Sequence, residues 1–125
     1  MKKLFVLLGL MFVSQAAYSQ VVVNGVNINN LEEVTMVRLI VQERFLSNQV
    51  VVFVDYGQGV QGAPRRAREV INPSDGRRIR FNSTMHAVNF MIDNGWEYLE
   101  SMVLPTDGNA NSSGDIQYLF RRPRN

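Results

Sequence analysis

The stretch NSTMHAVNFMIDNGWEYLESMVL, residues 82–104, contains a helix signal followed at once by a strand signal. Either of its first two residues can cap a helix by accepting a hydrogen bond from a free amide of the first turn. Apolar residues then recur at helical spacing, which predicts one buried stripe: Met85, Val88, Met91 and Ile92. Asn94-Gly95 supplies the left-handed conformation that ends a helix. We therefore expect one helix, and a strand over residues 96–104 directly after it.

Four further segments have the composition or the alternation typical of strands: residues 35–45, 50–56, 78–81 and 116–122. A short polar link joins the first two, so we expect them to pair antiparallel. Nearer the N-terminus, Asn24-Gly25 lies between apolar residues and is typical of a tight turn. A short hairpin and an extended arm both fit that region.

The expected order of elements is strand, strand, short strand, helix, strand, strand. This order predicts an α+β fold, with a mainly antiparallel sheet of about four to five strands and one helix packed across one face. Such a sheet and helix would bury one set of apolar side chains together: Val37, Leu39, Val52, Val88, Met91, Leu99 and Leu119.

Residues 1–19 have the three-part layout of a secretory signal peptide. Lys2 and Lys3 precede an apolar run over residues 4–13, and small and polar residues follow as far as Ser19. We expect cleavage between Ser19 and Gln20. The apolar run is shorter than the roughly 20 residues of a spanning helix, so no stable membrane insertion is expected after cleavage.

Residues 20–125 would then form a single small exported domain that is periplasmic, or extracellular and surface-exposed. The chain has no cysteine, which excludes disulfides and lipid attachment at a cysteine. Its only lysines are Lys2 and Lys3, so the processed domain has as many arginines as acidic residues. This neutral balance favours pairing within the domain over a polyanionic partner.

Gly57, Gly59 and Gly62 match the G-x-G-x-x-G pattern of dinucleotide-binding folds. In those folds a helix begins at the third glycine and a parallel strand follows it. Here Pro64 lies where the early helix should be, residues 66–71 have room for no more than a helical turn, and VINPSDG is typical of a turn. We therefore expect no nucleotide, and a long loop at about residues 57–77.

Five arginines in and after this loop are the candidate ligand-binding residues: Arg65, Arg66, Arg68, Arg78 and Arg80. A guanidinium group matches the geometry of carboxylate, sulfate and phosphate groups. One interpretation is therefore a loop that binds an anion or an acidic glycan. The other is a solvated loop whose arginines pair with acidic residues near Glu97.

The sequence contains no recognisable catalytic or metal-binding set. His86 is the only histidine, which together with the absence of cysteine excludes the usual zinc ligand sets. Glu97 and Glu100 lie three positions apart, and a regular strand places residues at an odd spacing on opposite faces. We expect no catalytic residues, no metal and no cofactor.

These observations predict a non-enzymatic protein-interaction module whose partner is an unknown exported or surface protein. Strands at the edge of a sheet can pair with a partner or with a second copy of the chain. The segment 79–81 and the terminal strand are the expected edges. The alternative function is anion or acidic-glycan binding through the arginine-bearing loop.

The segment FNSTMHAVNFMIDNGWEYLESMV, followed by IQYLFRRP, resembles a small bacterial domain family of unknown function. That family has a helix, a Gly-Trp-Glu strand and a closing strand with an aromatic-apolar-Phe-basic ending. Together with RFLSNQVVVFVDYGQG, the segment is similar to uncharacterised small exported proteins of Bacteroidetes-type bacteria. The resemblance implies a compact sheet-and-helix fold outside the cytoplasm and brings no catalytic residues. The family's usual lysines near the end are arginines here.

Overall fold

The computed structural model describes residues 19–43, 46–59, 68–104 and 115–123, so most of the expected signal peptide lies outside the described residues. The described strands form a four-stranded sheet in the order β4-β3-β7-β6 and a three-stranded sheet in the order β2-β1-β5. Their bounds are β1 Val22–Val23, β2 Val26–Asn27, β3 Met36–Glu43, β4 Val50–Asp55, β5 Val70–Ile71, β6 Glu97–Leu104 and β7 Asp115–Arg121. The helices are the 3-10 helix η1 (Ile28–Asn30) and α2 (Thr84–Asp93).

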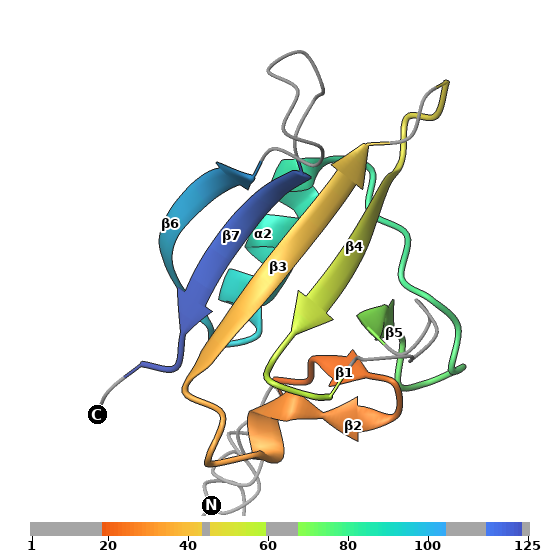
Figure 1. Ribbon diagram of the computed structural model, residues 1–125. Coiled ribbons are helices and arrows are strands. Elements are labelled where there is room, and N and C mark those ends of the chain that lie inside the picture. Colours follow the sequence, from red (N-terminus) through yellow and green to blue (C-terminus); the bar gives the residue numbers. More distant parts are fainter. Residues whose placement is uncertain (1–18, 44–45, 60–67, 105–114, 124–125) are drawn as a thin grey trace, which may run out of the picture.

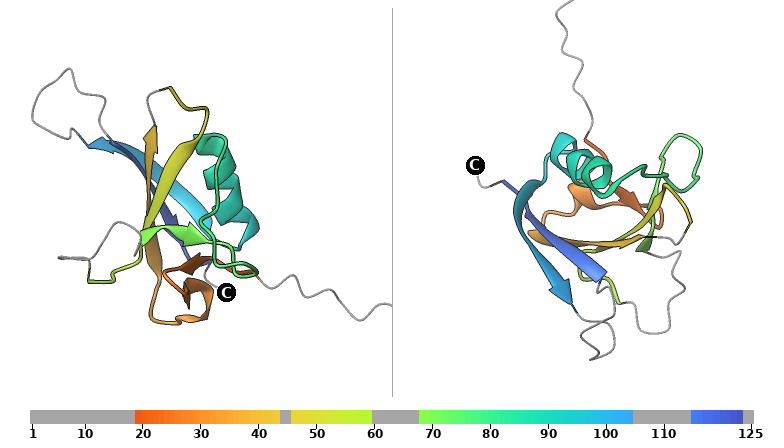
Figure 2. Two further views of the ribbon diagram at one scale, coloured as in Figure 1. Left: turned by 90° about the vertical axis from the view of Figure 1, so that its right-hand side faces the viewer. Right: turned by 90° about the horizontal axis from the view of Figure 1, so that it is seen from above.

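The helix α2 lies across one face of the four-stranded sheet, and the small sheet lies at one end of the larger one (Figure 1). The side view and the view from above in Figure 2 also place α2 against one face of the sheet. All strand pairs within the two sheets are antiparallel. The expected α+β fold with a mainly antiparallel sheet and one helix across one face is confirmed. We call the side of the larger sheet toward α2 the core face and the opposite side the outer face.

The helix begins and ends where its sequence signals predict. The Ser83 hydroxyl oxygen accepts a hydrogen bond from the His86 amide at 3.1 Å, which satisfies one of the free donors of the first turn. Gly95 has a φ of 86°, the left-handed conformation that ends the helix. The buried stripe of α2 is narrower than predicted and consists of Ala87, Val88 and Met91. The two outer positions of the predicted stripe flank the contact with the sheet and are exposed: Met85 and Ile92.

The terminal strand β7 is not an edge of the sheet, which corrects the sequence prediction. It pairs with β3 on one side and with β6 on the other. The other expected edge, around residues 79–81, forms only isolated bridges: Val50 with Phe81 and Ile71 with Arg78. Strand order depends on contacts between segments far apart in the chain, and the local sequence pattern does not encode it. Within the described residues, β6 pairs with β7 alone.

Two of the predicted core residues, Leu99 and Leu119, lie outside the core. The other five are buried: Val37, Leu39, Val52, Val88 and Met91. Leu119 pairs with Arg38 on the outer face, because its neighbours Tyr118 and Phe120 point into the core. Leu99 is 38% exposed, since a β-bulge between Tyr98 and Glu100 leaves it without a partner on β7.

The small sheet joins the N-terminal hairpin to the segment after the arginine-bearing loop. Asn24 and Gly25 both have positive φ, 50° and 80°, and form the turn between β1 and β2, so of the two alternatives the hairpin is confirmed. The strand β5 pairs with β1 and falls within the loop expected at residues 57–77, where the sequence allowed no more than a helical turn. A bridge from Phe53 to Glu69 connects β4 to the residue just before β5.

The side chain of Arg122, directly after β7, is hydrogen-bonded to the turn around η1. Its guanidinium donates hydrogen bonds to four backbone carbonyl oxygens at 2.9–3.2 Å: Ile28, Asn29, Leu31 and Val34. The same group lies 5.2 Å from the ring centroid of the buried Trp96, a cation–π contact. The cation is thus stabilised by backbone dipoles and an aromatic face.

Asn29 extends this network toward the N-terminal residues and the end of α2. Its Oδ1 accepts hydrogen bonds from the Val21 amide at 3.1 Å and from Trp96 Nε1 at 3.3 Å, and its Nδ2 donates to the Asn94 carbonyl at 2.8 Å. The Gln20 amide donates to Asn94 Oδ1 at 2.9 Å. The residues just after the expected cleavage site are therefore fixed to the folded domain.

We predict that Arg122→Ala lowers the free energy of unfolding by about 3 kcal/mol, because it leaves several carbonyls without a donor and uncovers Trp96. Chemical denaturation monitored by Trp96 fluorescence measures this loss. Arg121→Ala is the matched control, since Arg121 is exposed and its ion pair with Glu97 should contribute little. Equal effects of the two substitutions would contradict the assigned role of Arg122.

Candidate functional site

The structure does not gather the five candidate arginines into one described cluster. Arg65 and Arg66 lie outside the described residues. The guanidinium of Arg68 lies 5.6 Å from the centroid of the Phe53 ring, and its Nε is buried without a hydrogen-bond partner in the part of the chain that the structure describes. Arg68 is therefore held against the outer face of β4 by an aromatic side chain.

The other two arginines follow β5. Arg78 donates a hydrogen bond to the carboxylate of Glu69 at 3.2 Å, so its charge is already balanced. Arg80 is exposed and makes no hydrogen bond or ion pair with the described part of the chain. Of the three described candidates, Arg80 alone offers a guanidinium that no side chain of that part engages.

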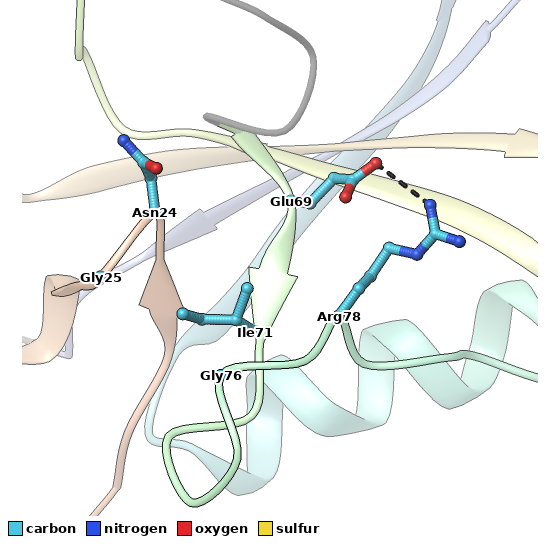
Figure 3. Close-up of a pocket in the computed structure, with 6 residues that line it drawn as sticks. All are labelled: Asn24, Gly25, Glu69, Ile71, Gly76 and Arg78. Carbon is cyan, nitrogen blue, oxygen red and sulfur yellow. Dashed lines mark hydrogen bonds and ion pairs between the residues drawn. The ribbon is translucent and has the colours of Figure 1, made fainter.

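A shallow, open hollow lies beside this ion pair, between the β1–β2 turn and the turn after β5 (Figure 3). Figure 3 shows the Glu69 carboxylate and the Arg78 guanidinium directed toward each other along one side of it. Its lining residues are Asn24, Gly25, Glu69, Ile71, Gly76 and Arg78. The two charges neutralise each other, so the hollow presents no net charge to an anion.

The open edge of the larger sheet is β6, and sequence reasoning missed it. Its backbone pairs with β7 along one side, and among the described residues no strand covers the other side. Large apolar side chains are exposed along it, with Tyr98 42%, Leu99 38% and Val103 62% accessible to solvent. An exposed strand edge with apolar side chains is a template for pairing with another extended chain.

The bulge at Leu99 places Glu97 and Glu100 on the same face of β6. Glu97 lies opposite Arg121 of β7 and Glu100 lies opposite Leu119, and both of these β7 residues are on the outer face. The expectation that the two glutamates face opposite sides is therefore wrong, because it assumed a regular strand. Nothing in the composition of the segment 97–100 marks the extra residue.

Glu97 and Arg121 form a two-pronged ion pair across β6 and β7. Arg121 Nε and Nη2 donate to the two carboxylate oxygens of Glu97, each at 3.0 Å. The hydrogen bonds from Arg121 lower the pKa of Glu97 below its ordinary value, and the same contact raises the pKa of Arg121. Glu100, which follows the bulge on β6, has no hydrogen bond or ion pair with any described residue.

The core face at the β6 edge is aromatic. The ring of Tyr98 lies 5.9 Å from that of Phe120 and 6.4 Å from that of Tyr118, measured between centroids. Desolvation raises the pKa of Tyr118, with further contributions from Tyr98 and Glu43. These contacts hold the partly exposed Tyr98 ring in place at the edge.

On the outer face, Arg38 of β3 connects the neighbouring strands β4 and β7. It donates to Asp55 on β4 and to Gln117 Oε1 on β7, the latter at 3.3 Å. The carboxylate and the amide face the guanidinium from opposite sides. This pairing fixes strand positions and balances the charge of Arg38 with that of Asp55.

The described residues contain no group of three or more His, Cys, Asp and Glu side chains placed to hold a metal ion. His86 Nδ1 accepts a hydrogen bond from the Asn82 amide at 3.2 Å, and its ring meets Phe81 edge-on. Its contacts are those of a residue that shapes the start of α2. In the same part of the chain, none of the helices has the length and apolarity to span a bilayer.

No family model matches the chain, and comparisons with curated proteins and with solved structures find no significant match. The resemblance to small exported proteins of Bacteroidetes-type bacteria therefore stays a prediction.

The raised pKa of Tyr118 predicts a pH dependence of stability. The unfolded chain loses the tyrosine proton at its ordinary pKa of 10.0, before the folded chain does. The contribution of Tyr118 to stability is therefore intact below this pH and is lost as the pH rises through the folded-state value. We expect Tyr118→Phe to reduce the loss of unfolding free energy between about pH 8 and about pH 11, measured by urea denaturation. An equal loss in both proteins would refute this.

Proposed function

We propose that the protein is an exported, non-enzymatic protein-interaction module that binds an extended segment of another protein along the edge of β6. The open backbone edge of β6 is the observation that carries this proposal. A partner strand would pair with the amides and carbonyls on the side of β6 that no described strand covers, as in other cases of strand addition to a sheet.

The shape of β6 suits strand addition better than accidental aggregation. The strand is eight residues long, enough for several pairs of backbone hydrogen bonds. The bulge at Leu99 and the acidic residues Glu97 and Glu100 interrupt it, and such features limit unselective edge-to-edge association. Its first residue directly follows Trp96, which is buried and bonded to Asn29. The edge is therefore held in a fixed conformation before a partner binds, which lowers the entropic cost of association.

Export is part of the proposal and is supported by the layout of residues 1–19. Gln20 and Val21, which would begin the processed chain, are bonded to Asn94 and Asn29. The expected cleavage site thus coincides with the start of the packed domain, because Val21 is fully buried.

The alternative is anion or acidic-glycan binding through the arginine-bearing loop. One observation favours it: the Nε of Arg68 is buried and has no hydrogen-bond partner among the described residues. The ion pair between Arg78 and Glu69 weighs against it, because a ligand would have to compete with an internal carboxylate.

The first test uses a display library of random linear peptides long enough to span β6. A selected peptide should slow amide hydrogen exchange within β6 more than in β4. Val103→Lys adds a charge and a long side chain at the exposed edge and should weaken the selected peptide at least about tenfold, roughly 1.4 kcal/mol. Met85→Lys on α2 is the matched control, since Met85 is also exposed and apolar, and should leave the affinity unchanged.

The results separate the two candidate functions. Selected peptides that protect another surface, or that bind Val103→Lys as tightly as the original protein, would refute strand addition at β6. A rise in melting temperature with heparin or phosphate that is lost when Arg65, Arg66 and Arg68 are replaced by alanine would support anion binding instead.

A further inference from the structure

The two faces of β6 differ sharply in chemistry. The side chains of Glu97, Glu100 and Met102 lie on the outer face, as their pairing with Arg121, Leu119 and Gln117 shows. The side chains of Tyr98, Ser101 and Val103 lie on the core face, paired with Phe120, Tyr118 and Ile116. One face of the edge is therefore acidic and the other is apolar and aromatic.

The acidic charge on the outer face is only partly balanced. Arg121 is the described cation that contacts β6, and both of its bonds go to Glu97. Arg38, further across the sheet, is engaged by Asp55 and Gln117. Glu100 thus stays an exposed carboxylate next to the position that a partner strand would occupy. A side chain directly across from it on that strand would lie within reach of an ion pair.

The core face of the edge offers an apolar contact that α2 does not cover. Tyr98 and Val103 are 42% and 62% exposed, although both belong to the face that packs on the helix. The smaller Ser101 lies between them along this face. Apolar side chains of a partner strand would cover Tyr98 and Val103 and remove further apolar surface from water.

A second copy of the chain fits this edge poorly. Pairing β6 with β6 of another copy would bring Glu100 of each copy onto one outer face of two neighbouring strands, beside the two Glu97 carboxylates that Arg121 of each copy already pairs. Carboxylates facing each other across adjacent strands destabilise the pair. The described part of β6 contains no lysine or arginine that could offset the two Glu100 carboxylates.

We propose that the segment bound by β6 is an amphipathic strand from a different protein, in which lysine or arginine alternates with apolar residues. This rests on the proposed function. The basic side chains face Glu100 on the outer face, and the apolar side chains face Tyr98 and Val103 on the core face. The spacing of two between like residues follows from the alternation of side chains along a strand.

The test compares three synthetic peptides of the same length as β6, eight residues. The first alternates valine and lysine. The second has the same composition with the lysines and valines in separate blocks, and the third alternates valine and glutamate. Titration with the full exported domain should show binding of the first peptide, with affinity at least about tenfold above that for either of the others.

Charge reversal on the protein provides the second arm. Glu100→Arg should weaken the valine–lysine peptide about tenfold and strengthen the valine–glutamate peptide by a similar factor. Glu33→Arg is the matched control, because Glu33 is an exposed carboxylate in a turn away from β6 and should change neither affinity. Circular dichroism of each variant checks that the fold is retained.

The outcomes also distinguish this inference from the proposed function. If library peptides bind β6 but show no alternation of basic and apolar residues, the edge is a binding site and the inferred partner pattern is wrong. Equal binding of the alternating and blocked lysine peptides would overturn the inference as well. A dimer in sedimentation that Val103→Lys abolishes would assign the edge to a second copy of the chain.

Discussion

The contact between Arg122 and the turn around η1 is the constraint on which the first and last segments of the described domain depend. A buried or half-buried guanidinium usually requires a carboxylate. Here four backbone carbonyls and the ring of Trp96 take that place. Backbone acceptors do not titrate, so this interaction keeps its strength over the whole pH range in which the arginine is charged. Neighbouring Arg121, paired with an exposed glutamate, lacks this property.

Asn29 and Asn94 connect the turn that Arg122 contacts to the N-terminal residues of the described domain. Through them the Gln20 and Val21 amides, the end of α2 and the indole of Trp96 share one hydrogen-bond network. The network also fixes the point at which β6 begins, since β6 starts at the residue after Trp96. The network that stabilises the N-terminal residues of the domain therefore also fixes the first residue of the β6 edge.

Local sequence signals predicted the positions of the helix and most strands well, but they predicted poorly which strands pair with each other. Ser83 and Gly95 set the limits of α2 through interactions within a few residues, which a sequence pattern can encode. The position of β7 between β3 and β6, and the bulge at Leu99, depend on pairing between distant segments. Those two features decide which strand is the edge and which face carries Glu100. The candidate arginines were recognised by type, but their partners, Phe53 and Glu69, became known only from the fold.

The two edge strands of the larger sheet, β4 and β6, differ in how far other described residues cover their backbones. The proposed function rests on this difference. The β4 edge is partly closed by bridges to Phe81 and Glu69, and Arg68 covers the Phe53 ring. A fold that needed only to avoid aggregation would gain from the same protection at β6. Instead β6 keeps a long backbone edge, an acidic outer face and an exposed aromatic residue whose ring is held by Tyr118 and Phe120. Bulge and charge limit unselective pairing at this edge, and no other described strand covers its backbone, which is the basis of the proposed binding of a strand with complementary pattern.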